Sequence, residues 1–184
     1  TVQTDEVKCE IEKVIGIRSN IHVTGNMKFD ALEDTSFVIK DELSRDLLTQ
    51  YQESQSPILV AGCVSQFSEY DLVIDAYAQA REQQPNFKLV LAPRHPENDE
   101  HMSYIRKKLT KTTIPFQFKT ELGAKELELP EVLVLNTVGE LKAFYSIANH
   151  CYVGKNHNIL EPLAFGKAIA VLDQWETSYP SYPV

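Results

Sequence analysis

The chain has 184 residues, of which 43% are hydrophobic and 24% charged, and its formal net charge is −8. This length allows one domain with a substantial core, and the composition is typical of an ordinary globular protein. The acidic balance argues against a nucleic-acid-binding surface, which normally carries a basic excess.

The cysteine pattern and the apolar runs indicate the compartment. The three cysteines are widely spaced and form neither a zinc-binding spacing nor a disulfide framework, which favours a reducing cytosol. The longest apolar run, residues 58–64, is far shorter than the roughly 20 residues of a membrane-spanning helix. No signal peptide is recognisable. We therefore expect a soluble intracellular domain without a metal site.

The predicted elements alternate between strand and helix. Residues 1–15 read as a helix with apolar residues along one face, residues 21–23 as a short strand, and residues 36–55 as a second amphipathic helix. Further strands are predicted at residues 58–62, 87–92, 116–118, 132–135, 151–153 and 168–172, and further helices at residues 69–83, 99–109, 139–148 and 159–165. The acidic stretch at 121–131 reads as a loop, and the tail from Trp175 has no pattern.

This alternation predicts an α/β fold with a Rossmann-like parallel sheet flanked by helices. The continuous apolar run at residues 58–62 supports it, because strands of a parallel sheet are covered on both faces. The chain starts within a helical pattern and ends in an unpatterned tail, so we expect it to be part of a longer protein.

A stiff loop follows the strand at residues 87–92. Pro93 fixes its own backbone, and Pro96 pushes His95 towards extended conformations. Such a loop can hold the Arg94 guanidinium ready for bidentate hydrogen bonds to a phosphate or a carboxylate. The carboxyl end of a strand is also where ligands bind in open α/β sheets. The alternative is that Arg94 pairs with Glu97 or with a helix end.

Asn158 and Glu161 have the spacing of a capping box at the start of the last predicted helix. In one interpretation Asn158 caps the helix and Glu161 bonds back to the cap. In the other, the exposed N–H groups of the helix start bind a phosphate, and Glu161 accepts hydrogen bonds from ribose hydroxyls. His157, just before them, either donates to that phosphate or is a solvated loop histidine.

The turn after the strand at residues 132–135 is a further candidate. Gly139 stands where the backbone must approach another group closely, and the Thr137 hydroxyl is predicted to cap the following helix. The sequence contains no GxGxxG, P-loop, HExxH or GxSxG motif. We therefore expect neither a metal site nor a nucleophilic triad.

Five strings in this order resemble one family: VTGNMKFD at residues 23–30, AG at 61–62, PRHPE at 93–97, NTVGEL at 136–141 and HNILEP at 157–162. They are similar to the carboxyl-terminal half of the bacterial 3-deoxy-D-manno-octulosonic acid (Kdo) transferases of lipopolysaccharide synthesis. The similarity runs from about residue 3 to residue 167.

The resemblance implies the second half of a two-domain GT-B glycosyltransferase, with residues 1–30 as an interdomain segment and first strand and residues 31–184 as the donor-binding domain. This half would bind CMP-Kdo, which is a substrate, so no cofactor is expected. An N-terminal domain absent from the chain would bind the lipid A precursor and supply the catalytic carboxylate. Such enzymes invert the anomeric centre without a metal, at the cytoplasmic face of the inner membrane. No catalytic residue is expected in this fragment, which we predict to bind CMP and to transfer nothing.

By the same likeness Arg94 and the helix start at Asn158 face the CMP phosphate, Glu161 faces the ribose, and the turn at residues 137–140 faces the nucleotide. The candidate donor-binding residues are Arg94, His95, Thr137, Gly139, Glu140, His157, Asn158 and Glu161. Two alternatives stay open. One is the donor domain of another GT-B enzyme that uses a UDP-sugar. The other is a non-enzymatic α/β interaction domain in which Arg94 and Glu161 are structural.

Overall fold

The computed structural model describes residues 1–16, 20–25, 35–123 and 129–176. Most of the VTGNMKFD string, part of the predicted 121–131 loop and the end of the tail lie outside the described residues. The chain divides into two compact units, residues 1–35 and residues 36–184.

The first unit contains one helix, α1 (Asp5–Ile15), among its described residues. The Thr4 side chain accepts a hydrogen bond from the Val7 N–H at its start, and Gly16 ends it in a left-handed conformation with φ of 66°. None of the residues of α1 is buried. The strand predicted at residues 21–23 is wrong: a strand needs a ladder of pairs, and here only Val23 pairs, in one isolated bridge to Val2.

The second unit is built on a six-stranded sheet in the order β3-β4-β2-β1-β5-β6, in which all neighbouring strands pair in parallel. The strands are β1 (Ile58–Val64), β2 (Lys88–Pro93), β3 (Phe116–Phe118), β4 (Val132–Val134), β5 (His150–Val153) and β6 (Ala168–Ala170). The helices are α2 (Glu42–Glu53), α3 (Phe67–Gln83), α4 (Asp99–Thr110), the 3-10 turn η2 (Lys119–Glu121), α5 (Leu141–Ile147) and α6 (Leu160–Ala164). The predicted Rossmann-like parallel sheet flanked by helices is confirmed.

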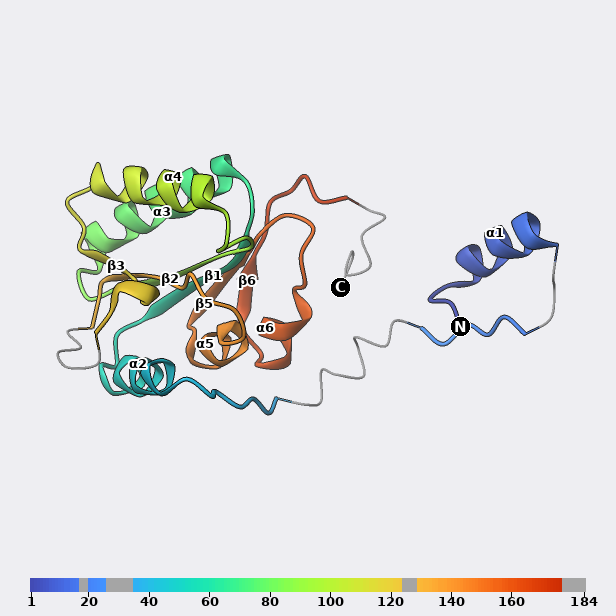
Figure 1. The fold of residues 1–184 in the computed structure, drawn as a ribbon, viewed down its shortest axis with the longest axis horizontal. Coiled ribbons are helices and arrows are strands. Elements are labelled where there is room, and N and C mark those ends of the chain that lie inside the picture. Colours follow the sequence, from blue (N-terminus) through green and yellow to red (C-terminus); the bar gives the residue numbers. More distant parts are fainter. Residues whose placement is uncertain (17–19, 26–34, 124–128, 177–184) are drawn as a thin grey trace. The chain divides into compact units, whose positions relative to one another are not determined.

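Helices cover both faces of the sheet, with α3 and α4 on one face and α2 and α5 on the other (Figure 1). Successive residues of β1 therefore serve two cores. Val60 packs in the cluster that includes residues of α2 and α5, whereas Ala61 and Val64 pack in the cluster that includes residues of α3 and α4. Because both faces are covered, the central strand β1 reads in sequence as a continuous apolar run.

Two predicted helices start later than expected, for local reasons. The helix predicted from residue 36 begins at Glu42, because the Asp41 carboxylate accepts the Ser44 N–H at 2.9 Å and caps it there. The helix predicted from residue 139 begins at Leu141, because Gly139 has a φ of 108°, which no helical residue adopts.

The end of β1 is packed against α5 with no room to spare. A Cβ atom added at Gly62 would lie 1.8 Å from the Tyr145 hydroxyl oxygen. Tyr145 is buried, and its hydroxyl has no hydrogen-bond partner among the described residues. The hydroxyl is therefore held by packing alone, and the absence of a side chain at residue 62 makes space for it.

We expect Gly62→Ala to lower the free energy of unfolding by about 1–3 kcal/mol, the usual cost of overpacking a core. Gly123→Ala is the matched control, because a Cβ at Gly123 meets nothing within 4 Å. Urea unfolding of the second unit measures both changes. Equal midpoints for the two variants would contradict the close packing at Gly62.

Candidate functional site

The sheet has a topological switch point at β1. This strand pairs with β2 on one side and with β5 on the other, and the chain reaches β5 only after it has built β2, β3 and β4. The connections that leave β1 and β5 therefore diverge at the carboxyl edge, where ligands bind in open α/β sheets. The loops after β1, β2 and β5, at residues 65–66, 94–98 and 154–159, follow strand ends at this edge.

The end of β1 and the first residue after β5 are in backbone contact. Pairing of β1 with β2 shifts between Gly62 and Val64, and Cys63 between them adopts a φ of 55°, the geometry of a β-bulge. The Gly154 N–H donates to the Gly62 carbonyl at 3.0 Å. A Cβ at Gly154 would lie 2.1 Å from the Cys63 carbonyl oxygen, so only glycine allows this approach.

Two of the predicted site residues, Arg94 and Glu161, affect the pKa of the Cys63 thiol. Burial raises the pKa of its thiol to about 11, with a further upward contribution from the Glu161 carboxylate and an opposing one from the Arg94 guanidinium. Both charges therefore act on the bulge. Arg94 and Glu161, which are far apart in sequence, lie in the surroundings of the same strand end.

The backbone of Arg94 is hydrogen-bonded to β1, whereas its side chain points to no ion-pair partner among the described residues. Its N–H donates to the Val64 carbonyl at 2.8 Å, and its side chain is exposed and makes no ion pair among the described residues. The predicted alternative, a pair with Glu97, does not form, because Glu97 lies 3.1 Å from His95 Nδ1 instead. The pKa of Glu97 is lowered by its own backbone N–H and by His95. The loop therefore satisfies its carboxylate internally and presents the guanidinium.

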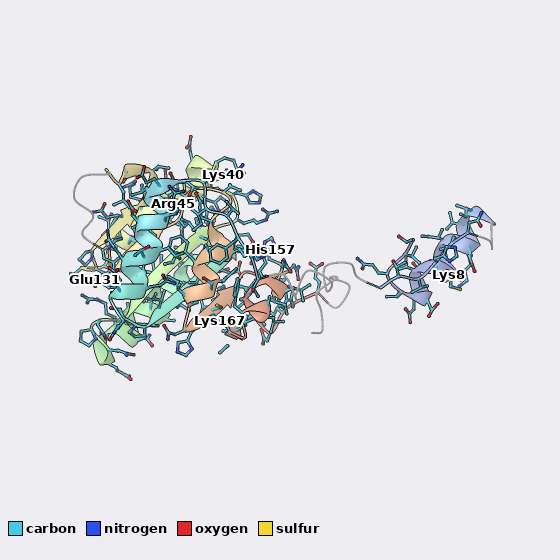
Figure 2. The ribbon with its side chains drawn as sticks, turned by 90° about the horizontal axis from the view of Figure 1, so that it is seen from below. Lys8, Lys40, Arg45, Glu131, His157 and Lys167 are labelled. Atoms are coloured by element: carbon cyan, nitrogen blue, oxygen red, sulfur yellow. The ribbon has the colours of Figure 1, made fainter. Side chains whose placement is uncertain are left out.

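His157 lies half-buried on the loop after β5 (Figure 2). Burial lowers its pKa, and the positive charge of Arg94 lowers it further. The imidazole is therefore neutral at neutral pH and carries one N–H donor. His157 and Arg94 therefore lie close enough for the charge of Arg94 to act on the imidazole.

Only the Asn158 half of the predicted Asn158–Glu161 capping box forms. Asn158 Oδ1 accepts the Leu160 N–H at 3.1 Å, so Asn158 satisfies one N–H at the start of α6. Glu161 does not bond back to a backbone N–H but accepts from the Asn158 amide at 3.4 Å. This long, weak bond leaves most of the hydrogen-bonding capacity of the Glu161 carboxylate available.

The turn after β4 is tied to a buried ion network. Lys119 Nζ lies 2.8 Å from Glu140 Oε1 and 2.8 Å from Asp41 Oδ2, and Lys119 is 5% exposed. The prediction that Thr137 caps α5 is wrong, because its hydroxyl donates to Glu140 Oε2 at 3.0 Å. Both oxygens of Glu140 are therefore engaged inside the fold. This network joins three segments: the start of α2, η2 and the turn at residues 137–140.

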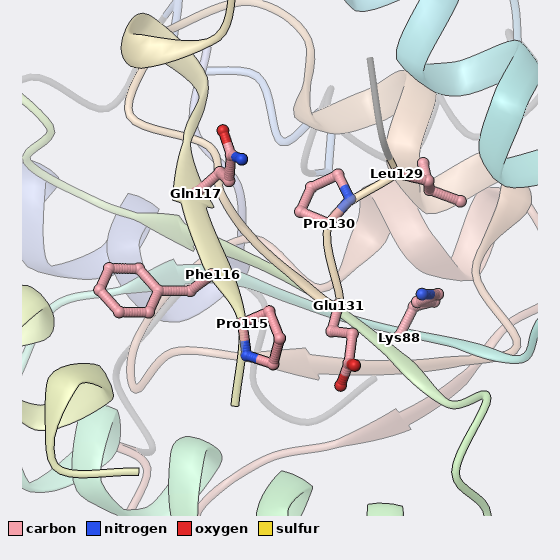
Figure 3. Close-up of a pocket in the computed structure, with 7 residues that line it drawn as sticks. All are labelled: Lys88, Pro115, Phe116, Gln117, Leu129, Pro130 and Glu131. Carbon is pink, nitrogen blue, oxygen red and sulfur yellow. The ribbon is translucent and has the colours of Figure 1, made fainter. Parts of the chain in front are cut away.

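Two hollows of about 350 Å³ lie outside the switch point. One adjoins the ion network and is lined by Val38, Ile39, Lys40, Asp41, Val138, Gly139 and Glu140. The other lies at the amino ends of β2, β3 and β4 (Figure 3) and is lined by Lys88, Pro115, Phe116, Gln117, Leu129, Pro130 and Glu131. Glu131 in this second hollow is paired with Arg81. Glu131 and His157 lie at opposite sides of the unit, so the second hollow is remote from the carboxyl edge (Figure 2).

Local sequence patterns do not identify the residues that hold the site together. Lys119 lies outside the predicted elements and Asp41 lies within a predicted helix, and neither position indicates that these residues fix the turn at residues 137–140. Glu69 was read as part of a helix, although it is buried and bonds to the loops after both β1 and β5. Gln66 with Glu69 is a capping pair, and that spacing was the one local signal available.

Among the described residues, no group of three or more His, Cys, Asp or Glu side chains could hold a metal ion. In the same part of the chain, no helix is long and apolar enough to cross a membrane.

Comparison with a solved structure gives the class of domain. The C-terminal CMP-Kdo binding domain of WaaA from Acinetobacter baumannii matches with a TM-score of 0.56 and 19% sequence identity, covering 70% of this chain and 67% of that one. At this identity the match establishes the fold, a helix-flanked parallel sheet of the kind found in that domain. No protein-family model matches the chain.

Comparison with curated proteins then gives the relatives. The chain is 29% identical over 158 residues to the 3-deoxy-D-manno-octulosonic acid transferase of Haemophilus influenzae, covering 80% of this chain and 34% of that protein. It is 27% identical over 148 residues to the enzyme of the same name from Aquifex aeolicus, covering 77% and 35%. The resemblance to Kdo transferases, which are glycosyltransferases, is confirmed. The chain spans about a third of the length of these relatives.

The ion network has a testable pH dependence. Hydrogen bonds from Lys119 and then from Ser44 lower the pKa of Asp41 from 3.8 to about 2. A carboxylate whose pKa falls on folding stabilises the fold above its unfolded pKa and loses that contribution as the pH drops towards the folded value. We expect Asp41→Asn, which keeps a good helix cap, to be less stable than the parent by a constant amount above about pH 5. This difference should shrink as the pH falls from about 4 towards 2.

Urea unfolding between about pH 3 and 7 measures this difference. Asp46→Asn on the same helix is the control, because the exposed Asp46 makes no ion pair among the described residues. A stability difference for Asp41→Asn that stays the same down to the lowest pH would contradict the role of its charge.

Proposed function

We propose that this chain is the donor-nucleotide domain of a Kdo transferase and binds CMP-Kdo. The observation that carries the proposal is the similarity to two Kdo transferases over about four fifths of the chain. The solved structure with the matching fold is described as a CMP-Kdo binding domain. The site at the carboxyl edge is compatible with an anionic ligand, because Arg94 offers an exposed guanidinium there that makes no ion pair within the described ranges.

In this proposal different residues around the switch point contact different parts of CMP-Kdo. Arg94, His95, His157 and the helix start at Asn158 face the CMP phosphate, where a guanidinium gives bidentate charge-assisted bonds. Glu161 accepts from the ribose hydroxyls, since its carboxylate is only weakly bonded to Asn158. The turn of Thr137, Gly139 and Glu140 faces the nucleotide. The positive charge of Arg94 also stabilises the negative charge that develops on departing CMP.

The whole enzyme would be an inverting GT-B glycosyltransferase that transfers Kdo to a lipid A precursor at the cytoplasmic face of the inner membrane. CMP-Kdo is the donor substrate, and we propose no cofactor and no metal. The acceptor and the catalytic carboxylate belong to an N-terminal domain that this chain does not contain. Residues 1–30 would then connect the domains, and residues 31–184 would form the donor domain.

The first test is a calorimetric titration of the chain with CMP and with UMP. A half-site binds weakly, and a dissociation constant near 1 mM corresponds to roughly −4 kcal/mol, so high nucleotide concentrations are needed. We expect CMP to bind more tightly than UMP. We expect Arg94→Ala to lower the affinity for CMP by about tenfold or more, because a hydrogen bond to a charged group is lost. Glu161→Ala should lower this affinity as well.

Two further variants make this titration specific. Arg94→Lys keeps the charge but loses the planar fork, so an intermediate affinity is expected. Arg81→Ala removes a guanidinium that pairs with Glu131 at the amino edge of the sheet and should leave CMP affinity unchanged. Preference for UMP would favour a UDP-sugar enzyme. Failure to bind either nucleotide, with the fold intact, would contradict the proposal and leave an interaction domain.

A second test asks whether the fragment is inactive on its own. We expect no transfer of Kdo when the purified chain is incubated with CMP-Kdo and a lipid A precursor, because no general base for the acceptor hydroxyl is identifiable in it. The measurement is mass spectrometry of the extracted lipid, with a full-length Kdo transferase as the positive control. Detectable transfer by the fragment would contradict the assignment of the catalytic carboxylate to another domain.

A further inference from the structure

Glu69 is a buried carboxylate at the switch point. It is not among the proposed donor-binding residues. It lies in the first turn of α3 and is 1% exposed. Each of its oxygens accepts two hydrogen bonds. Oε2 accepts from the N–H groups of Ser65 at 3.4 Å and Gln66 at 3.2 Å. Oε1 accepts from the Tyr152 hydroxyl at 2.7 Å and from the Lys155 N–H at 2.7 Å.

Capping of α3 accounts for only one of these oxygens. A capping box needs the Glu side chain to accept the N–H of the cap residue, and Oε2 does this for Gln66. The bonds of Oε1 are the shorter ones and lead to a different part of the chain, to β5 and the loop that follows it. They add nothing to the helix cap. Their effect is to tie the loop after β5 to the start of α3.

That loop carries two of the proposed phosphate-facing residues. Gly154 is already fixed at its root by the bond to the Gly62 carbonyl. The Lys155 N–H on Glu69 is the next anchor along the chain, directly before Asn156, His157 and Asn158. Moving this anchor would displace His157 and Asn158 relative to Arg94, whose own backbone is bonded to Val64 at the end of β1.

We propose that Glu69 is a positioning residue for donor binding: it holds the loop after β5 against the end of β1, so that His157 and Asn158 meet the same phosphate as Arg94. This inference rests on the proposed function. A carboxylate suits the position because it accepts from all four partners, three of which are backbone N–H groups that can only donate. In a glutamine of the same shape, an NH₂ group facing Ser65 and Gln66 loses both of those bonds, whereas one facing Tyr152 and Lys155 loses only the Lys155 bond, because the tyrosine hydroxyl can also accept. The second arrangement keeps more bonds, so the bond to Lys155 is the one lost.

The test compares CMP binding by the parent chain, Glu69→Gln and Tyr152→Phe. We expect Glu69→Gln to lower the affinity for CMP by about tenfold, because one hydrogen bond to the charged phosphate becomes misaligned. Tyr152→Phe removes a single bond to Oε1 and should have a smaller effect in the same direction. Glu131→Gln is the matched control, because it weakens a carboxylate pair with Arg81 at the opposite edge and should leave CMP affinity unchanged.

Ligand-observed NMR with cytidine separates positioning from a general loss of structure. If Glu69 acts through the phosphate loop, Glu69→Gln reduces CMP affinity much more than cytidine affinity. If cytidine does not bind even the parent detectably, the phosphate carries the affinity, and the loss for CMP decides alone. Equal proportional losses for CMP and cytidine would overturn the inference.

Amide hydrogen exchange of the ligand-free chain supplies a second readout. The Lys155 N–H should exchange faster in Glu69→Gln, whereas amides in the core of β1 should not change. CMP affinity equal to that of the parent in a folded Glu69→Gln chain would also overturn the inference. Should Glu69→Gln fail to fold, Tyr152→Phe decides by the same criteria. Failure of the parent to bind CMP would instead overturn the proposed function itself.

Discussion

The parallel pairing of β1 with both β2 and β5 is the constraint on which the candidate site depends. It brings strand ends that are distant in sequence to one edge, and the bulge at Cys63 with the close approach of Gly154 brings the loop roots into contact. The backbone of Cys63 leaves no room for a side chain at Gly154, and the Tyr145 side chain leaves none at Gly62. Glu69 continues the contact outward from the sheet into the loops.

The charges near the carboxyl edge fall into two groups with different consequences. Lys119 pairs with both Asp41 and Glu140, and Lys119 and Glu140 are buried. Removing one partner of a buried pair leaves an uncompensated charge, so such a network fixes the turn after β4 firmly. Arg94 behaves in the opposite way, because its loop pairs Glu97 with His95 and leaves the guanidinium at the surface. At this edge the carboxylates of Asp41, Glu140 and Glu97 are bonded within the fold. The Arg94 guanidinium is exposed where we propose that the phosphate binds.

Local sequence patterns predict the sheet well because most strands of the second unit are short, largely apolar segments between breaks. The strand expected in the first unit does not form, since Val23 is exposed and among the described residues pairs only with Val2. The late starts of α2 and α5 depend on the Asp41 cap and on the backbone of Gly139, which the helical pattern in the sequence does not reveal. Thr137 could not be placed because its partner Glu140 is positioned by Lys119, 21 residues away in sequence. Arg94 was found from its stiff loop, whereas nothing local revealed that one oxygen of Glu69 reaches the loop after β5.

A donor site at the carboxyl edge of the sheet can be located by mapping backbone amide chemical shifts in the isotope-labelled chain during a titration with CMP. We expect shifts concentrated in the loops after β1, β2, β4 and β5, including the amides of Arg94, Gly139 and His157. Shifts concentrated instead around Lys88 and Glu131, at the amino edge of the sheet, would contradict it. Absence of any shift at saturating nucleotide concentration would contradict it as well.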